Sequence, residues 1–252
     1  MAVEFALTPD LRWSADLATQ ARAARDAGFA SLCVFTDRAD DDARRTFDAA
    51  GIGCLDVLAL MISKNEEATL RAAERAAASA AVMGAPWVTA VLRAPVDEAA
   101  RRLVARCAAV LSDAGAAMAL EFSPLSSVTS IGPALEIVDA VGRGAGVLID
   151  TWHFFVGDSS WADLERLPVE RIAYVQFDDA GPLESEDLFT ETMDRRLMPG
   201  DGTFELERFA STLLDRGFDG VVSVEVLSRE LSALPVPEFA GRARDAVARY
   251  WC

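Results

Sequence analysis

Oxygen-bearing side chains close four mainly apolar segments in the second half of the chain. Each segment is short, and the residue that ends it is a carboxylate or an amide. These closing residues are Glu121, Asp150, Gln176 and Glu225. Carboxylates can act as general acid and base, and they can also hold a divalent cation. The four residues are therefore our candidates for the chemical centre of the protein.

The segment around Asp150 is the most informative of the four. An apolar run over 147–149 follows a Gly-rich turn and leads into Asp150, and His153, the only histidine of the chain, comes three residues later. Such a run predicts a strand buried on both faces, with Asp150 at its end. Taken alone, the stretch leaves a second interpretation open, in which Asp150 caps a helix and His153 is a half-buried structural ring.

Three carboxylates gathered in one place need compensation, because like charges raise one another's pKa. A divalent cation removes that conflict. Oxygen ligands suit Mn²⁺ or Mg²⁺ better than zinc, which prefers His and Cys. The sequence therefore predicts one divalent ion, and the alternative is a hydrogen-bonded acid network without metal.

Strands and helices alternate along the whole chain. The predicted strands are 3–7, 31–35, 53–60, 87–92, 116–120, 147–150, 172–176 and 221–225. The first predicted helix begins near residue 14 and ends at Gly28. The others are 39–50, which ends at Gly51, and 65–83, 96–114, 133–141, 204–216 and 239–250.

Eight such units in 252 residues predict an α/β protein, a single (β/α)8 TIM barrel domain over 1–252. The ends of parallel barrel strands meet at one mouth, so the four closing residues should converge there. No GxGxxG motif follows the first strand, which removes the main support for a dinucleotide fold.

One connection, 177–203, is much longer than a usual strand-to-helix loop and shows little periodicity. Its acids are Asp178, Asp179, Glu184, Glu186, Asp187, Glu191, Asp194 and Asp201. We expect most of them to be solvated. The loop also contains Arg195 and Arg196, and an arginine in such a loop should be held by a neighbouring carboxylate or by a substrate oxygen.

Composition narrows the classes of partner. A formal net charge of −16 makes nucleic acid an unsuitable partner, because phosphate binding needs clustered Lys and Arg. We find no signal peptide and no membrane span. The cysteines at 33, 54, 107 and 252 form no CxxC pair, which fits reduced thiols in a cytoplasmic protein. We expect a small-molecule substrate, and the sequence leaves a homo-oligomer open.

The segments ALEFSP, VLIDTWHFF, YVQFDDA, RRLMPGDGTFELERF and GFDGVVSVEV resemble the sugar phosphate isomerase/epimerase family with a xylose-isomerase-like TIM barrel. The likeness covers 115–230 well. It implies that the metal ligands are Glu121, Asp150, Gln176 and Glu225. It also implies that His153 and Arg196, which precedes the PG-x-G loop, bind the substrate.

Gln176 departs from many members of this family, which carry His at that position. The amide is shared with a branch that includes 3-dehydroshikimate dehydratases, so the choice of reaction stays open. Endonuclease IV, a further relative, uses several histidines around three metals. The single histidine of this chain excludes that activity.

The resemblance implies abstraction of a proton next to a carbonyl. Our hypothesis is that Glu121 and Glu225 serve as acid and base, and that the metal stabilises the enediolate. Trp152, Phe154 and Phe155 would line the mouth, with Trp152 contacting substrate, or they would pack against the barrel rim.

We favour an isomerase or epimerase. A dehydratase of the same family is the first alternative, because the same intermediate can expel a hydroxyl that lies β to the carbonyl. A barrel that binds a small ligand or a partner without turnover is the second. The acidic loop disfavours a multiply phosphorylated substrate, so an unphosphorylated ketose, polyol or small acid is as open an alternative as a sugar phosphate.

Overall fold

Eight parallel strands form a closed barrel in the computed structural model, which describes residues 3–251. The strands are β1 (Glu4–Leu7), β2 (Ser31–Phe35), β3 (Gly53–Ile62), β4 (Trp87–Leu92), β5 (Ala117–Glu121), β6 (Ala145–Asp150), β7 (Ile172–Phe177) and β10 (Val221–Val224). They follow one another around the barrel, and β10 pairs with β1 to close it. The predicted (β/α)8 barrel is confirmed.

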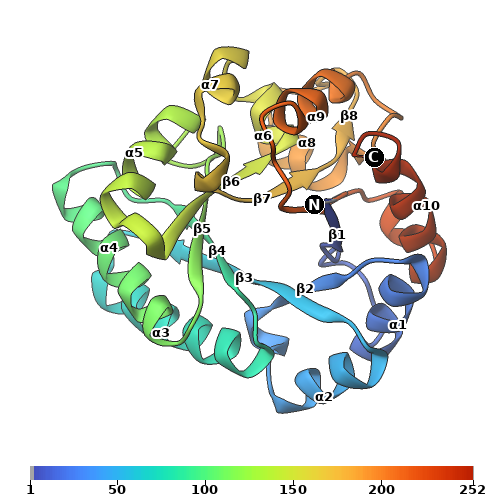
Figure 1. Cartoon of the computed structure of the whole chain (residues 1–252), viewed down its shortest axis with the longest axis horizontal. Coiled ribbons are helices and arrows are strands. Elements are labelled where there is room, and N and C mark those ends of the chain that lie inside the picture. The colour runs from blue at the N-terminus through green and yellow to red at the C-terminus, as the bar shows by residue number, and fades with distance from the viewer. Residues whose placement is uncertain (1–2, 252) are drawn as a thin grey trace.

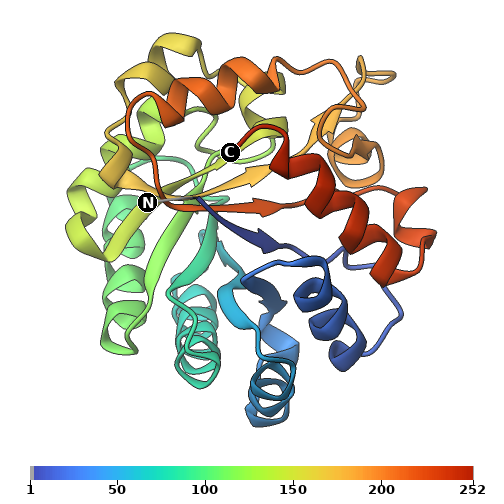
Figure 2. The ribbon, with the colours of Figure 1, turned by 45° about the vertical axis from the view of Figure 1, so that its right-hand side comes forward.

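Helices surround the barrel on the outside (Figure 1). They are α1 (Leu17–Ala27), α2 (Asp41–Ala50), α3 (Glu66–Met83), α4 (Glu98–Asp113), α5 (Ile131–Val141), α6 (Thr151–Val156), α7 (Trp161–Arg166), α8 (Leu188–Asp194), α9 (Leu206–Leu214) and α10 (Val236–Ala248). The last helix, α10, packs beside α1 (Figure 2), so the two ends of the chain close the outer layer together.

Polar caps explain where the first four helices begin. The side chains of Asp16, Asp40, Asn65 and Asp97 each accept a hydrogen bond from a free backbone N–H in the first turn. Gly28 and Gly51 end α1 and α2 in the left-handed conformation, as their spacing predicts. Local sequence therefore determines these helix limits.

Strand β6 is buried along its whole length, which confirms the prediction for the segment that ends in Asp150. Gly146 lies in this strand against β7, and a Cβ built on it would come within 2.9 Å of the backbone nitrogen of Ala173. Only glycine fits there without displacing backbone. The close approach of β6 and β7 fixes the relative positions of Asp150 and Gln176, which are partners in the register.

The long connection 177–203 is more ordered than its weak periodicity predicts. It contains the two antiparallel strands β8 (Asp179–Ala180) and β9 (Arg196–Leu197), with α8 between them. Elements this short give no periodic signal in a sequence. The prediction that its acids are mostly solvated is wrong for Asp178, Asp179 and Glu191, which are buried.

Asp179 shows why burial of such an acid is stable. Its carboxylate accepts hydrogen bonds from the backbone N–H groups of Gly200, Gly202 and Phe204, each at 3.0 Å. A carboxylate with several amide donors is well stabilised when buried. Asp179 thereby holds the PG-x-G segment against β8 and fixes the end of the connection.

Cys33, Cys54 and Cys107 are free thiols, as the sequence predicts. Cys252 and the first two residues lie outside the described residues. None of the helices within residues 3–251 is long and apolar enough to cross a membrane.

Candidate active site

The four predicted site residues lie at one end of the barrel. Glu121 and Asp150 are the last residues of β5 and β6, Gln176 lies near the end of β7, and Glu225 directly follows β10. The register pairs Gln176 with both Asp150 and Ser223, so these strand ends are neighbours around the mouth.

A cavity of about 320 Å³ opens at this mouth. Glu121, Gln176 and Glu225 line it, together with His153 and Arg196. Asp150 is fully buried and lies behind the lining residues. The volume is at the lower end of the range for small-molecule sites, which fits a compact ligand.

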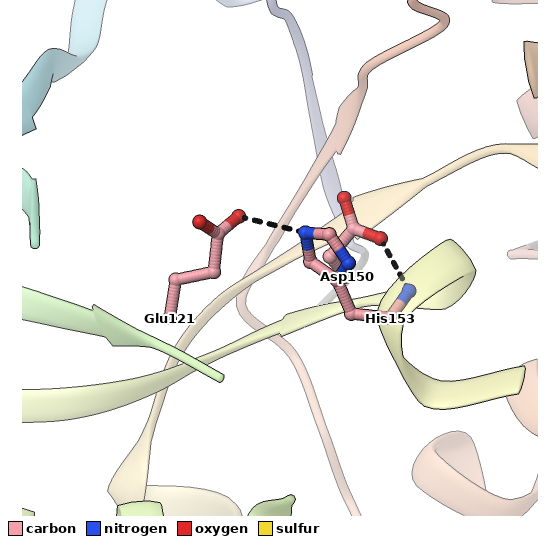
Figure 3. Close-up of side chains that lie close together, drawn as sticks. All are labelled: Glu121, Asp150 and His153. Carbon is pink, nitrogen blue, oxygen red and sulfur yellow. Dashed lines mark hydrogen bonds and ion pairs between the residues drawn. The ribbon is translucent and has the colours of Figure 1, made fainter. Parts of the chain in front are cut away.

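Glu121, Asp150 and His153 form one cluster (Figure 3). One potential ligand atom from each residue lies within 4.8 Å of the other two. The Nε2 atom of His153 lies 3.6 Å from Oε1 of Glu121, and its backbone N–H donates to Oδ1 of Asp150 at 2.9 Å. Asp150 thus caps α6 as well as belonging to the cluster, so its two interpretations from sequence are compatible.

Arg196 reaches into the cluster from β9, and its side chain is almost completely buried. Its Nη1 atom donates to Oδ2 of Asp150 at 2.6 Å and to Oε2 of Glu225 at 3.2 Å, and it also contacts Asp178. The expectation that an arginine of this loop is held by neighbouring carboxylates is therefore confirmed. Glu225 is joined to Asp150 through this guanidinium.

Sequence reasoning missed Asp178 as a member of the site. The residue lies two positions after Gln176, and side chains two apart in an extended chain point the same way. This alternation of side chains along a strand could have identified Asp178 from the sequence. Its Oδ1 atom accepts a hydrogen bond from Oγ1 of Thr151 at 2.6 Å, in addition to the contact with Arg196.

The electrostatics show how strongly the buried acids interact with their surroundings. Burial raises the pKa of Asp178 to about 7, although Arg196 acts in the opposite direction. Burial likewise raises the pKa of Glu225 well above its ordinary value. Burial alone would also raise the pKa of Asp150, but the positive charges of Arg196 and His153 outweigh it and lower that pKa. The positive charges therefore favour the ionised form of Asp150, whereas burial outweighs them at Asp178 and Glu225.

Two buried polar atoms at the site have no hydrogen-bond partner within the described chain: Oε1 of Gln176, which is an acceptor, and Nδ1 of His153. The Nε2 atom of Gln176 donates to Oε1 of Glu225 at 2.9 Å, which leaves the amide oxygen free to bind another group. A buried acceptor without a partner is costly, and a bound cation would satisfy it. The donor set of carboxylates, amide and imidazole thus fits a divalent metal ion.

Comparison with known proteins identifies the family of the chain. The sequence profile of the family described as "Xylose isomerase-like TIM barrel" matches residues 11–249. The chain belongs to this family.

The relatives are named for two different activities. An inosose isomerase of Halalkalibacterium halodurans is 31% identical over 169 residues, which are 65% of this chain and 59% of that relative. A 3-dehydroshikimate dehydratase of Pseudomonas aeruginosa is 32% identical over 90 residues, 36% of this chain and 14% of that protein. The match to the isomerase spans about three fifths of its length.

The solved structures agree on the fold. A crystal structure of the IolI protein with a binding zinc atom superposes with a TM-score of 0.86 at 22% identity, covering 98% of this chain and 99% of that one. At this identity the likeness concerns the barrel and the arrangement of its elements.

Trp152 lies behind the site residues and does not line the cavity. Its side chain is fully buried, with the ring 5.4 Å from the ring of His153 in an edge arrangement. The Cζ atom of Arg196 lies 5.8 Å from the indole. This placement does not favour the predicted direct contact of Trp152 with substrate. The indole does not reach the cavity, and His153 and Arg196 lie beside it.

Phe154 and Phe155 belong to an aromatic cluster on the outer side of the barrel. Phe154 lies 5.2 Å from Trp161, and Phe155 stacks on Phe204 at 4.5 Å, measured between ring centroids. Of the two sequence-based alternatives, packing against the rim is confirmed for these two rings.

A further buried acid, Asp56 on β3, lies inside the barrel. Its Oδ2 atom accepts hydrogen bonds from Oγ1 of Thr89 at 2.7 Å and from the hydroxyl of Tyr174 at 3.1 Å. Burial raises the pKa of Asp56 to about 6, against the opposing effect of these hydroxyl groups. Asp56 could not be recognised as part of such a group from the sequence, because its partners lie on strands distant in the chain.

Proposed function

We propose that the protein is a divalent-metal-dependent isomerase or epimerase that moves a proton next to a carbonyl of a small hydroxy ketone. One observation carries the proposal: two carboxylates, Glu121 and Glu225, line one cavity around a donor set that fits a metal ion. The relative named inosose isomerase supports this class of reaction.

Proton transfer is assigned to the two glutamates. Glu225 accepts the proton from the carbon next to the carbonyl, and Glu121 returns a proton at the neighbouring or opposite position. Glu225 suits this role because its carboxylate lines the cavity where the reacting carbon would lie. His153 and Arg196 donate hydrogen bonds to substrate oxygens.

Glu121, Asp150, Gln176 and Glu225 would hold the metal, with the imidazole of His153 beside them. A bound divalent ion supplies Lewis acidity, which stabilises negative charge on the substrate's oxygens. Asp150 and Gln176 serve as structural ligands. We propose Mn²⁺ or Mg²⁺ as the ion. Zinc is the alternative, because the donor set includes a nitrogen and because the IolI crystal structure has zinc.

A dehydratase is the second candidate, and Gln176 favours it. The resemblance assigns this amide to the branch that contains 3-dehydroshikimate dehydratases, and one such enzyme matches over 90 residues. Loss of water would use the same base, with His153 as the acid that protonates the departing hydroxyl.

The first test is the metal content of protein purified without chelators, measured by elemental mass spectrometry. Asp150→Asn should lose the metal with the fold retained in circular dichroism. Asp48→Asn, which removes an exposed carboxylate on α2, serves as the matched control. Near-stoichiometric metal in the wild type and the control supports the site.

The second test separates the reactions. Ketoses, inososes and 3-dehydroshikimate are incubated with the loaded protein in D₂O, where deuterium uptake without loss of water indicates an isomerase or epimerase. Water loss indicates the dehydratase. A protein that takes up no metal and exchanges no deuterium is instead a binding barrel without turnover.

A further inference from the structure

The cavity is divided into a polar floor and apolar walls. The charged and amide groups of the strand ends lie at the floor. The walls are mainly apolar and include Phe35, Leu58, Ala59, Met61, Val91 and Leu125, although the hydroxyl groups of four further residues, Thr8, Thr89, Ser123 and Thr192, also belong to the lining. Leu11 and Phe189 extend this apolar surface to the mouth, where both are more than half exposed.

Such walls are unsuitable for a ligand with hydroxyl groups on every carbon. Each hydroxyl that leaves water for an apolar surface loses hydrogen bonds that the wall cannot replace. The floor can satisfy a carbonyl and one or two neighbouring hydroxyls. The remainder of the ligand should therefore carry few hydroxyl groups.

Arg93 interrupts the apolar wall at its upper edge. The residue directly follows β4, its backbone N–H donates to the carbonyl oxygen of Ile62 at 2.8 Å, and its Nη1 atom donates to the carbonyl oxygen of Leu125 at 2.7 Å. Within residues 3–251 it forms no ion pair with a carboxylate, whereas Arg196 contacts three of them. Arg93 therefore offers a fixed and exposed cation to whatever enters the cavity.

The strand register gives the position of Arg93 relative to the floor. Val91 on β4 is the partner of Glu121 on β5, and Arg93 lies two residues further along the chain towards the mouth. Two residues of a strand span about 7 Å. A six-membered ring with polar groups on opposite sides, or an open chain of similar length, fits between these levels.

We propose that the substrate is a small keto acid, whose carbonyl end binds at the floor and whose single carboxylate pairs with Arg93. This substrate class rests on the proposed function for the chemistry at the floor. A carboxylate is the anion whose two oxygens match the donors of a guanidinium. The apolar walls cover the sparsely hydroxylated body between the two ends.

The charge of the whole chain agrees with one negative group and not with several. A net charge of −16 repels anions from the mouth, and one guanidinium compensates one carboxylate. A phosphate ester would bring two negative charges to the same single cation.

A matched pair of probes tests the proposal with the metal-loaded protein. The probes are 4-oxocyclohexane-1-carboxylate and its neutral amide, and the dissociation constants are measured by ligand-observed NMR titration. The wild type should prefer the carboxylate, and Arg93→Gln should weaken carboxylate binding about three- to tenfold while the amide changes less than about twofold. Arg93→Lys should keep part of the preference.

Arg75→Gln is the control, since it removes one exposed positive charge on α3 away from the cavity. Its carboxylate preference should equal that of the wild type, and added salt should reduce the preference of both proteins. Equal binding of the two probes by the wild type, a preference that survives in Arg93→Gln, or no binding of either probe would each overturn the proposal.

These results are separate from a failure of the proposed function. If the protein binds no metal or exchanges no deuterium but still prefers the carboxylate through Arg93, the proposed substrate class stands and the proposed reaction is wrong. If the protein binds metal and exchanges deuterium but does not prefer the carboxylate, the proposed reaction stands and the proposed keto acid substrate is wrong.

Discussion

The two halves of the barrel mouth differ in what they present to the cavity. The first half, from β1 to β4, contributes Phe35, Leu58 and Val91, together with the hydroxyl groups of two threonines and, at the edge, the guanidinium of Arg93. The second half contributes two glutamates, an amide, an imidazole and a guanidinium. The first half thus offers apolar surface and one cation at its edge, and the second half offers the charged groups that could transfer protons.

The groups proposed for the reaction and the residues proposed to recognise the substrate therefore lie on different halves of the mouth. Charged groups on the second half are held by one another, as the contacts of Arg196 with three carboxylates show. Residues on the first half hold nothing at the reacting centre, so they can vary with the substrate without disturbing it. The comparison leads to four predictions, which begin with the largest expected effect.

Glu121→Gln and Glu225→Gln should each reduce kcat by a factor of about 10² to 10⁴, because each removes a proton-transfer group. The measurement is steady-state turnover of whichever substrate shows deuterium exchange. Circular dichroism should remain that of the wild type.

Glu205→Gln is a suitable control, since this glutamate lies at the beginning of α9 with an exposed side chain. It should leave kcat unchanged. Substantial turnover in both Glu121→Gln and Glu225→Gln would contradict the assignment of acid and base to the second half.

Arg196→Met should destabilise the metal-free protein by about 3 to 5 kcal/mol, because it leaves buried carboxylates without their counter-ion. Urea unfolding with a chelator present measures this loss of free energy. Added divalent metal should restore part of it, since the cation replaces the missing positive charge.

Arg195→Met provides the comparison. Arg195 is the preceding residue, its side chain is 38% exposed, and it pairs with Glu184 and Glu191. Its loss should cost less than about 1 kcal/mol. Equal destabilisation by the two substitutions would mean that Arg196 does not compensate the acids of the site.

The sequence predicted the second half of the mouth better than the first, for a physical reason. Buried parallel strands appear as apolar runs, and an acid that ends such a run is visible without any knowledge of its neighbours. Asp150 and Glu121 were found in this way. The barrel then follows from the count of strand and helix units.

Contacts between residues distant in the chain could not be predicted in the same way. Arg196 meets Asp150 across 46 residues, and Tyr174 meets Asp56 across 118. Both contacts depend on strand register and side-chain direction, which a single sequence does not determine. The apolar walls left no motif either, because the same residues could have been ordinary core.

Asp56 tests whether the first half also contains a titrating group that matters for stability. Its pKa in the folded protein is raised to about 6, above the value of 3.8 for an unperturbed aspartate. The folded state therefore binds the proton more tightly than the unfolded state. The stability that this proton provides is fully present below about pH 4 and is lost as the pH rises through about 6.

Asp56→Asn removes this pH dependence. We expect the free energy of unfolding of the wild type to fall relative to that of Asp56→Asn by on the order of 3 kcal/mol between pH 4 and pH 7. Urea unfolding of both proteins across this range measures the difference, in which the contributions of all other acids cancel. A constant difference would show that Asp56 has the same pKa in both states.

Trp152→Phe has the smallest expected effect and decides whether the second half also recognises substrate through an aromatic ring. The indole is fully buried beside His153, and its Nε1 atom has no hydrogen-bond partner within the described residues, so a smaller ring loses packing but no hydrogen bond. We expect a loss of about 1 to 2 kcal/mol of stability and a KM within about twofold of the wild type. Thermal unfolding and steady-state kinetics measure the two quantities. A KM raised tenfold with unchanged stability would instead place Trp152 in contact with substrate, and the division of the mouth into a chemical half and a recognition half would then fail at this residue.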